Sequence, residues 1–445
     1  MIFVSLRCKF IREVGLGIRN GKTKIMKRFL LFAALALAAW SCTKGDYESD
    51  LKGGGDPGEG YFGGDYEMEG EPGADYGDYD GGGSSSNGGG AAGVLTAGEW
   101  NDLAHWDFWG SLMSYQPDPN APEEQRSPDY ARMAYEWGFN TSRRVAVSVK
   151  DEAGNPVANV PVELLLNGDV IWKTRTSNKG NAELWRDLFS ARGQESTSTE
   201  PLAISINGKK QALAPEISDW TGVKVNEYTV SAAAPDKQAD IAFIVDATGS
   251  MTDEIDFLKK DLLSILEKVQ QSQAGVAIRT GAVFYRDKGD TYLTRSDDFS
   301  KPAKTMEFIR KQEADGGGDL PEAVHSALEV TLSSLSWNAA ARTRMAFLIL
   351  DAPAHLSQQG VVASLQKSIQ SFSALGIRMI PVLASTGDKT TEFMCRDFAI
   401  VTGGTYVFLT DDSGIGGEHL TPSVGEYEVE KLNDLLIRLI EDYIR

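Results

Sequence analysis

The chain has 445 residues, more than one ordinary domain needs, so we expect two or three folded units. Hydrophobic residues make up 42% and charged residues 24% of the sequence, which is typical of globular proteins. The 44 basic and 63 acidic residues give a formal net charge of −19. Such a charge repels phosphate backbones and argues against nucleic acid as a partner. Divalent cations or basic surfaces suit it better.

The first 41 residues have the composition of an export signal. Lys27 and Arg28 precede an apolar run from Phe29 to Trp40, and Cys42 follows soon after. The run is too short to remain as a membrane-spanning helix. The pattern resembles a bacterial lipoprotein signal peptide, which implies that Cys42 is acylated and becomes the new N-terminus. An ordinary cleaved signal with an incidental Cys42 is the alternative.

The signal pattern begins at Met26, which predicts that residues 1–25 precede the true start of the protein. Residues 1–41 hold eight of the basic residues and one of the acidic ones, so a chain that begins at Cys42 carries a net charge of −26.

Residues 42–93 are predicted to form a disordered acidic tether. From residue 45 onward this segment holds twelve acidic residues and one basic residue, Lys52, and it cannot bury enough apolar surface to offset its chain entropy. The acidic residues nearest Cys42 resemble surface-export signals of some bacterial lipoproteins; they are Asp46, Glu48 and Asp50. We therefore expect a lipid-anchored protein of the bacterial cell envelope, on the outer membrane and exposed at the cell surface.

Residues 94–140 are rich in aromatic side chains and are predicted to be helical. Thr96 and Glu99 have the spacing of a capping box at a helix start. Trp100, Trp106 and Trp109 follow at mixed spacing. These tryptophans either form an exposed stacking surface or dock on a neighbouring domain, and the second interpretation is favoured because large aromatic side chains usually become buried.

Residues 141–232 are predicted to form an all-β sandwich. Val145, Val147 and Val149 alternate with less apolar residues, the pattern of a half-buried strand. Turn sequences rich in Gly, Asn and Asp separate this run from further alternating runs. The region resembles the carboxypeptidase-regulatory-like or immunoglobulin-like sandwiches of bacterial surface proteins, and no residue in it suggests catalysis.

Residues 236–445 alternate between strand-like and helix-like segments. The apolar run Ile241–Val245 is typical of a parallel strand that is covered on both faces, and an amphipathic helical pattern follows it. We therefore expect an α/β domain with an open, mostly parallel sheet and helices on both faces. In such sheets, ligands bind at the carboxyl ends of the strands.

Four oxygen-bearing side chains follow two of these predicted strands. Asp246, Thr248 and Ser250 come directly after one apolar strand, and Asp351 follows another. Because the carboxyl ends of parallel strands meet at one edge, these residues should lie close together. Carboxylate and hydroxyl oxygens suit Mg²⁺, Mn²⁺ or Ca²⁺ better than softer metals.

The Asp-x-Thr-x-Ser pattern at 246–250 resembles the metal-ion-dependent adhesion site of von Willebrand factor A (VWA) domains. Tyr285-Arg-Asp, the Gly316–Glu322 loop and the Leu350–His355 segment resemble further parts of that family in the same order. The resemblance covers about 200 residues and implies a Rossmann-like fold. It also implies a metal site at Asp246, Thr248, Ser250 and Asp351.

The glycine-rich loop departs from the family pattern, which often has a threonine ligand there. Asp319 is the substitute by position. If Asp319 binds the metal, it neutralises the ion further and weakens its attraction for a partner's acidic side chain. Alternatively, Asp319 caps a helix that begins at Leu320.

Other polar residues near the same edge are expected to be structural. His325 and His355 are predicted to anchor loops through hydrogen bonds, with a catalytic or ligand role as the alternative. Arg286 and Asp287 are predicted to pair with each other beneath the site.

The resemblance implies a binding protein that captures a protein ligand through an acidic side chain at the metal. An envelope scaffold in which the metal only stabilises the fold is the second hypothesis, and a metal-assisted hydrolase is the third. No general base or nucleophile elbow accompanies the predicted site, so we expect no enzymatic activity.

Overall fold

The computed structural model describes residues 95–115, 129–190, 200–231, 233–318, 320–413 and 419–445. The predicted leader, Cys42, the tether and Asp319 lie outside these ranges. The chain divides into two units, Met1–Ser84 and Ser85–Arg445, and all the described residues belong to the second. Among them, no helix is both long enough and apolar enough to cross a membrane.

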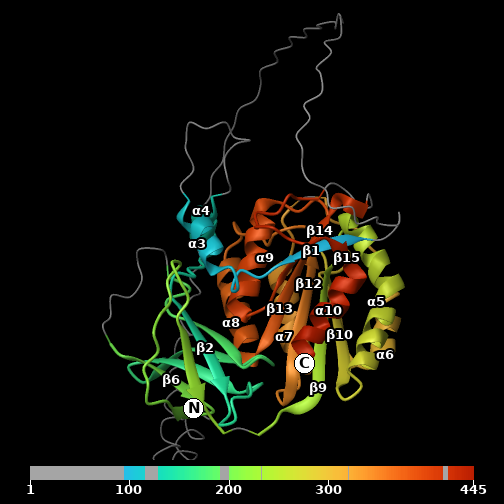
Figure 1. Ribbon diagram of the computed structural model, residues 1–445. Coiled ribbons are helices and arrows are strands. Elements are labelled where there is room, and N and C mark those ends of the chain that lie inside the picture. Colours follow the sequence, from blue (N-terminus) through green and yellow to red (C-terminus); the bar gives the residue numbers. More distant parts are fainter. Residues whose placement is uncertain (1–94, 116–128, 191–199, 232, 319, 414–418) are drawn as a thin grey trace, which may run out of the picture. The chain divides into compact units, whose positions relative to one another are not determined.

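An eight-stranded sheet forms the centre of the C-terminal half, in the order β11-β10-β9-β12-β13-β14-β1-β15 (Figure 1). The four pairings from β10 to β14 are parallel, and those of β11, β1 and β15 are antiparallel. The strands in chain order are β1 (Thr96–Trp100), β9 (Asp236–Asp246), β10 (Ala277–Tyr285), β11 (Thr294–Ser300), β12 (Ala341–Leu350), β13 (Ile377–Leu383), β14 (Tyr406–Thr410) and β15 (Glu430–Lys431).

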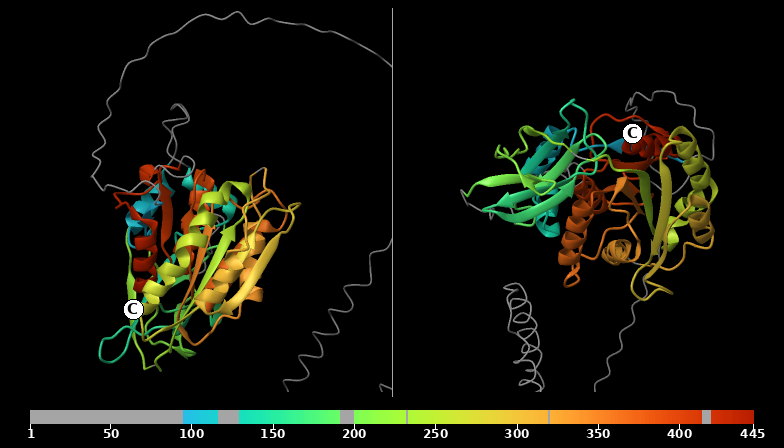
Figure 2. Two further views of the ribbon diagram at one scale, coloured as in Figure 1. Left: turned by 90° about the vertical axis from the view of Figure 1, so that its right-hand side faces the viewer. Right: turned by 90° about the horizontal axis from the view of Figure 1, so that it is seen from below.

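Helices cover both faces of this sheet (Figures 1 and 2). One face packs against α5 (Thr252–Ser272), α6 (Pro302–Ile309) and α10 (Leu432–Ile444). The other face packs against α7 (Val324–Ser334), α8 (Val361–Leu375) and α9 (Lys389–Thr402). Short 3₁₀ turns lie at Gly249–Met251 and Asp411–Ser413. The predicted α/β fold with a mostly parallel sheet is therefore confirmed.

The central strand β9 shows why the sheet is buried on both sides. Ile241, Phe243 and Val245 belong to one hydrophobic core, and Ala242 and Ile244 belong to the other. Because successive side chains of a strand point to opposite faces, a continuous apolar run supplies both cores at once. The pattern read from the sequence therefore places β9 at the centre of the sheet.

The predicted helix at Thr96 is wrong, because Thr96–Trp100 is a strand. This strand, β1, lies between β14 and β15 and pairs with β14 from Thr96 opposite Thr410 to Trp100 opposite Tyr406. The Thr96 hydroxyl accordingly bonds to Thr410 rather than capping a helix. The first described strand of the chain thus belongs to the sheet of the C-terminal half.

The helices of this region are α3 (Trp106–Ser114) and α4 (Tyr130–Trp137). Their tryptophans are buried: Trp106 donates to the carbonyl of Asp219 at 2.7 Å, and Trp109 donates to the Thr141 hydroxyl at 2.9 Å and stacks on Phe393. The interpretation that these side chains dock on neighbouring elements is confirmed, and an exposed stacking surface is excluded for them.

A β-rich region lies between β1 and β9 in the chain. It has a three-stranded sheet in the order β5-β2-β8 and a four-stranded sheet in the order β4-β3-β6-β7. Trp172 donates to Ser373 of α8, and Trp185 donates to the Val401 carbonyl of α9, so the region packs on these helices. The strands are β2 (Arg144–Lys150), β3 (Pro161–Leu166), β4 (Asp169–Arg175), β5 (Asn181–Trp185), β6 (Leu202–Ile206), β7 (Lys209–Lys210) and β8 (Val225–Thr229).

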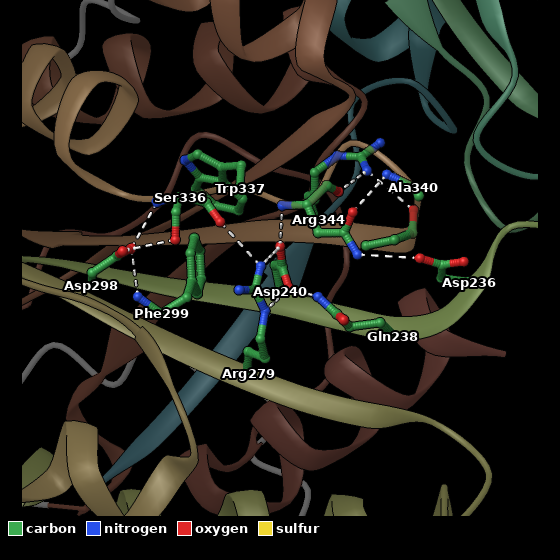
Figure 3. A network of polar contacts seen from close by, with 12 residues as sticks. Asp236, Gln238, Asp240, Arg279, Asp298, Phe299, Ser336, Trp337, Ala340 and Arg344 are labelled. Atoms are coloured by element: carbon green, nitrogen blue, oxygen red, sulfur yellow. Dashed lines mark hydrogen bonds and ion pairs between the residues drawn. The ribbon is translucent and has the colours of Figure 1, made fainter.

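A buried aspartate holds the amino ends of the central strands together (Figure 3). Both carboxylate oxygens of Asp240 accept hydrogen bonds from the Arg279 guanidinium, at 3.0 and 2.7 Å. Asp240 also accepts from the Asn338 backbone N–H and the Gln238 amide, at 2.7 Å each. One carboxylate therefore ties β9 to β10 and to the loop that leads into β12.

A second buried ion pair joins the N-terminal segment to α9. The guanidinium of Arg396 donates to both carboxylate oxygens of Asp102, at 2.9 and 2.6 Å, and both side chains are almost completely buried. Arg396 also contacts Glu392 at 3.5 Å. Since Asp102 follows β1, this pair locks that strand onto the domain.

Replacement of Asp102 is therefore expected to destabilise the protein strongly. Asp102→Ala leaves the buried Arg396 without its bidentate partner, which should lower the free energy of unfolding by about 3–5 kcal/mol in urea denaturation. Arg132→Ala removes an exposed helical pair with Glu136 and serves as the control, with an expected change below about 0.5 kcal/mol. If Asp102→Ala lowers the free energy of unfolding by less than about 1 kcal/mol, the ion pair does not hold the β1 segment on the domain.

Candidate metal site

Strands β9 and β12 are parallel neighbours, and their carboxyl ends lie at the same edge of the sheet. Val245 is opposite Ile349 in the register, so Asp246 is level with Leu350 and Asp351 comes one residue beyond it, close enough for the two charges to interact. Both carboxylates are buried, with exposed fractions of 0% and 3%. The structure thus brings Asp246 and Asp351 together at the ends of two separate strands, as expected from the sequence.

Asp246 is held by the turn that follows it. Its Oδ1 accepts hydrogen bonds from the backbone N–H and the hydroxyl of Thr248, at 2.9 and 2.8 Å. Its Oδ2 is buried and makes no hydrogen bond to any described residue. Burial and the charge of Asp351 together raise the pKa of Asp246 to about 7, although Thr248 and Tyr285 oppose the rise.

Asp351 has a similar environment. Its Oδ2 accepts a hydrogen bond of 3.3 Å from the Thr386 hydroxyl, whereas its buried Oδ1 finds no partner within the described part of the chain. Burial raises the pKa of Asp351, and the Ser250 hydroxyl lies close enough to lower it. Ser250 itself is exposed on the turn after β9.

Glu322 is a third carboxylate at this place, and the sequence reasoning assigned it no role. Its Oε2 is buried without a hydrogen bond to the described residues. Burial, together with the charges of Asp246, Asp287, Asp290 and Asp351, raises the pKa of Glu322 to about 9. The only signal in the sequence is its position three residues after Asp319 in the glycine-rich loop.

The glycine-rich loop packs directly against the turn after β9. Gly317 has a φ of +72°, and a Cβ atom there would lie 3.1 Å from the Cβ of Thr248. Its N–H donates to the Asp290 carboxylate, and the carbonyl of Gly316 accepts from the Gly249 N–H. Glycine is needed here because the backbone is left-handed and close to Thr248.

The prediction that a helix begins at Leu320 is wrong, because α7 begins at Val324. Asp319, the residue predicted to cap that helix or to bind the metal, lies outside the described residues. Leu320 is instead exposed at the mouth of the site, with 62% of its surface accessible.

The predicted pair between Arg286 and Asp287 is also wrong. The guanidinium of Arg286 contacts the Asp315 carboxylate at 3.2 Å and donates to the Glu313 carbonyl at 2.8 Å. Asp287 instead contacts His355 Nε2 at 2.7 Å. His355 therefore anchors its loop through a hydrogen bond, as predicted.

His325 is half-buried on α7, and burial lowers its pKa. Its Nδ1 has no hydrogen-bond partner among the residues that the structure describes. The predicted anchoring role for His325 therefore stays a prediction.

These residues surround an open pocket of about 290 Å³. It is lined by Thr248, Ser250, Glu322, Asp351 and Thr386 together with the glycine-rich loop, and Asp246 adjoins it through its hydrogen bond with Thr248. Hydroxyl and carboxylate oxygens are the ligands that small divalent cations prefer. Among the described residues, no three His, Cys, Asp or Glu side chains form a metal-binding group, so a cation here would need the hydroxyls of Thr248 and Ser250 as well.

The strand order defines a doubly wound α/β domain. Its pocket lies at the carboxyl ends of the strands, where ligands bind in such folds. Residues 240–391 match the family model described as the von Willebrand factor A domain. The chain therefore contains a VWA domain.

Two curated proteins match part of the chain. Alpha-protein kinase vwkA of Dictyostelium discoideum is 32% identical over 132 residues, which is 29% of this chain and 21% of that protein. An ariadne-like RING finger protein of Acanthamoeba polyphaga mimivirus is 34% identical over 123 residues, 27% of this chain and 12% of that protein. The chain thus spans about a fifth or less of the length of these relatives.

Two solved structures are similar at low identity. Proximal thread matrix protein 1 from the mussel byssus is 14% identical with a TM-score of 0.30, and the match covers 47% of each chain. The pilus adhesin SpaC from Lactobacillus rhamnosus GG is 13% identical with a TM-score of 0.32, over 46% of this chain and 30% of that one. TM-scores of this size support no conclusion about function.

The buried carboxyl of Asp246 should make the stability of metal-free protein depend on pH. Its folded pKa of about 7 lies above the ordinary value of 3.8, so the folded protein holds a proton that the unfolded chain releases. The free energy of unfolding should therefore fall as the pH rises from about 4 to 7, by about 2–3 kcal/mol between pH 5 and pH 7.5.

In Asp246→Asn the free energy of unfolding should fall less between pH 5 and pH 7.5, because an amide does not titrate. Urea denaturation of both proteins at pH 5 and pH 7.5 in the presence of a chelator measures the difference. Equal declines in the two proteins would contradict the raised pKa.

Proposed function

We propose that this chain is a cell-envelope lipoprotein whose VWA domain binds a divalent cation at the carboxyl edge of the sheet and uses it to hold a protein partner. One observation carries the proposal. Three carboxylates, Asp246, Glu322 and Asp351, each direct a buried oxygen without a described hydrogen-bond partner to the same edge of the sheet.

Such a group of carboxylates is unfavourable without a cation. Burying an ionised carboxylate has a large desolvation penalty unless an opposite charge compensates it, and like charges close together add to that penalty. The raised pKa values of Asp246 and Glu322 express this penalty. A divalent ion at the pocket supplies the missing charge, with the carboxylates of Asp246 and Asp351 and neighbouring hydroxyl groups as its ligands.

The donor set favours a small hard cation. Asp246 and Asp351 supply carboxylates and Thr248 and Ser250 supply hydroxyls, so Mg²⁺ fits best and Mn²⁺ or Ca²⁺ is the alternative. Asp319 is the proposed fifth member from the glycine-rich loop. Bound at this edge, the ion polarises oxygen ligands and attracts the acidic side chain of a partner protein.

The open mouth of the pocket supports a binding role. Ser250 is exposed, and Leu320 stands at the rim with most of its surface accessible. A partner's carboxylate reaches the ion from solvent at this point. If Asp319 is also a ligand, its extra negative charge weakens the attraction, and we expect modest affinity for the partner.

The envelope assignment rests on the sequence. The export-type segment that ends before Cys42, the acidic tether and the net charge of −19 fit a lipid-anchored protein displayed on the outer membrane of a bacterium. The membrane is then reached through the lipid at Cys42.

Titration of the purified chain with Mg²⁺, Mn²⁺ and Ca²⁺ by calorimetry tests the metal site. We expect saturable binding of at least one ion, and Asp351→Ala should weaken it by at least about tenfold because a direct ligand matters no less than an outer-shell partner. Asp253→Asn changes an exposed carboxylate on α5, outside the pocket, and should leave the affinity unchanged. No detectable binding of any of the three ions rejects the site.

Partner capture should depend on the ion more than folding does. Protein immobilised through its C-terminus is incubated with bacterial or host surface extract in Mg²⁺ or in EDTA, and the captured proteins are compared. We expect EDTA and Ser250→Ala each to abolish the specific bands while the melting temperature of the domain changes by only a few degrees.

The opposite pattern supports a different role. If EDTA unfolds the domain, and folded protein captures the same proteins with and without the metal, the ion only stabilises a scaffold. The adhesion proposal then fails.

A further inference from the structure

A second pocket, of about 290 Å³, lies far in the fold from the strand ends that carry Asp246 and Asp351. Its walls come from three parts of the chain: the loop after β1, the β4–β5 turn with the neighbouring strands β2 and β5, and the VWA domain at β13, the segment before β14 and the end of α10. Pockets at junctions between structural regions are common ligand sites.

The charged lining of this pocket is unbalanced. Arg144, Lys179 and Arg378 face Glu183 and Asp442. Both acids are already engaged. Arg144 donates to both oxygens of Glu183, at 2.7 and 3.0 Å, and Lys179 donates to Asp442 at 2.6 Å. One positive charge, that of Arg378, is left over.

Arg378 is 3% exposed and has only neutral partners. Its guanidinium donates to the carbonyls of Thr402 and Arg175, each at 2.6 Å, and neither carbonyl carries a charge. Glu183 acts on Arg378 only at longer range. A buried charge is unfavourable when no opposite charge compensates it. A buried guanidinium beside a cavity therefore attracts an anion strongly.

Two further arginines strengthen the positive field. The pKa of Arg344 falls to about 9 through burial and through the charges of Arg175 and Arg378. Arg344 donates to the carbonyls of Leu375 and Asn338, at 2.7 and 2.8 Å, and the charge of Asp240 partly offsets its own. This concentration of positive charge lies in a chain whose net charge is −19.

The neutral lining suits hydroxyl groups. The amides of Asn101, Asn178 and Asn181 and the hydroxyls of Thr405 and Tyr443 line the cavity. Asn101 donates to Thr405, whose hydroxyl meets that of Tyr443 at 2.9 Å. Amide and hydroxyl groups both donate and accept hydrogen bonds, so they adapt to a ligand with several hydroxyls.

We propose that this pocket binds a small polyhydroxylated anion, a sugar that carries a carboxylate or a phosphate group. The volume is at the lower limit of ligand pockets, which favours a single sugar unit over a larger molecule. The anionic group sits nearest Arg378 and Lys179, and the hydroxyls meet the amides. Such a ligand touches all three parts of the chain and stabilises the contact of the β-rich region with the VWA domain.

Calorimetry of the purified chain tests this site with four probes: glucuronate, glucose 6-phosphate, glucose and inorganic phosphate. We expect at least one of the two anionic sugars to bind at least about tenfold more tightly than glucose, because charge-assisted hydrogen bonds are the strong ones. Comparison of glucuronate with glucose 6-phosphate distinguishes the carboxylate from the phosphate form.

A pair of matched variants locates the binding. Lys179→Gln removes a positive charge from the pocket and frees Asp442, so the affinity should fall by about tenfold. Lys150→Gln changes another partly exposed, salt-bridged lysine of the β-rich region outside the pocket and should have no effect. Arg378→Lys keeps the charge but loses the fixed fork of donors, and it should also weaken binding.

Several results overturn the proposal. These are no binding of either anionic sugar, equal binding of glucose, inorganic phosphate bound as tightly as glucose 6-phosphate, or unchanged affinity in Lys179→Gln. Because Lys179 is exposed, its variant folds and decides the matter even if Arg378→Lys does not fold. The cation titration is independent, so either site can fail alone.

Discussion

Two carboxylates that end adjacent parallel strands constrain the whole C-terminal half. Asp246 and Asp351 are buried side by side, and only Asp246 Oδ1 and Asp351 Oδ2 find hydrogen bonds among the described residues. Two neighbours reduce this desolvation penalty by donating hydrogen bonds: the turn at Thr248 to Asp246 and the Thr386 hydroxyl to Asp351. None supplies a positive charge, because the nearby Arg286 is committed to Asp315. The edge is therefore electrostatically incomplete by itself.

The elements that could be predicted from the sequence are those whose signals are local. The apolar run of β9 identifies a central parallel strand, and its final residue places Asp246 at the edge. Asp351 follows by the same reasoning from β12. What the sequence could not predict is pairing over long distances. Thr96–Trp100 has the spacing of a capping box, yet its partners are more than 300 residues away in β14 and β15. Tertiary pairing overrides local propensity there.

The polar details of the site were less predictable for a related reason. Glu322 and Thr386 reach the pocket from loops, and the path of a loop depends on contacts that no periodicity records. Arg286 and Asp287 are neighbours in the chain, and adjacency suggested a pair. In the folded protein the two side chains have separate partners, Asp315 and His355. Sequence proximity was a poor guide because successive residues after a strand point in different directions.

Charge is also divided along the strands, and this division gives the two pockets opposite preferences. The carboxyl ends carry Asp246 and Asp351, while the amino ends of β12 and β13 carry Arg344 and Arg378. The β-rich region, inserted in the chain between β1 and β9, packs on α8 and α9 and closes over the basic end through β4 and β5. It leaves the acidic edge open to solvent. Under the two proposals, a cation binds at the edge that a partner can reach, and an anion binds at the junction between the two regions.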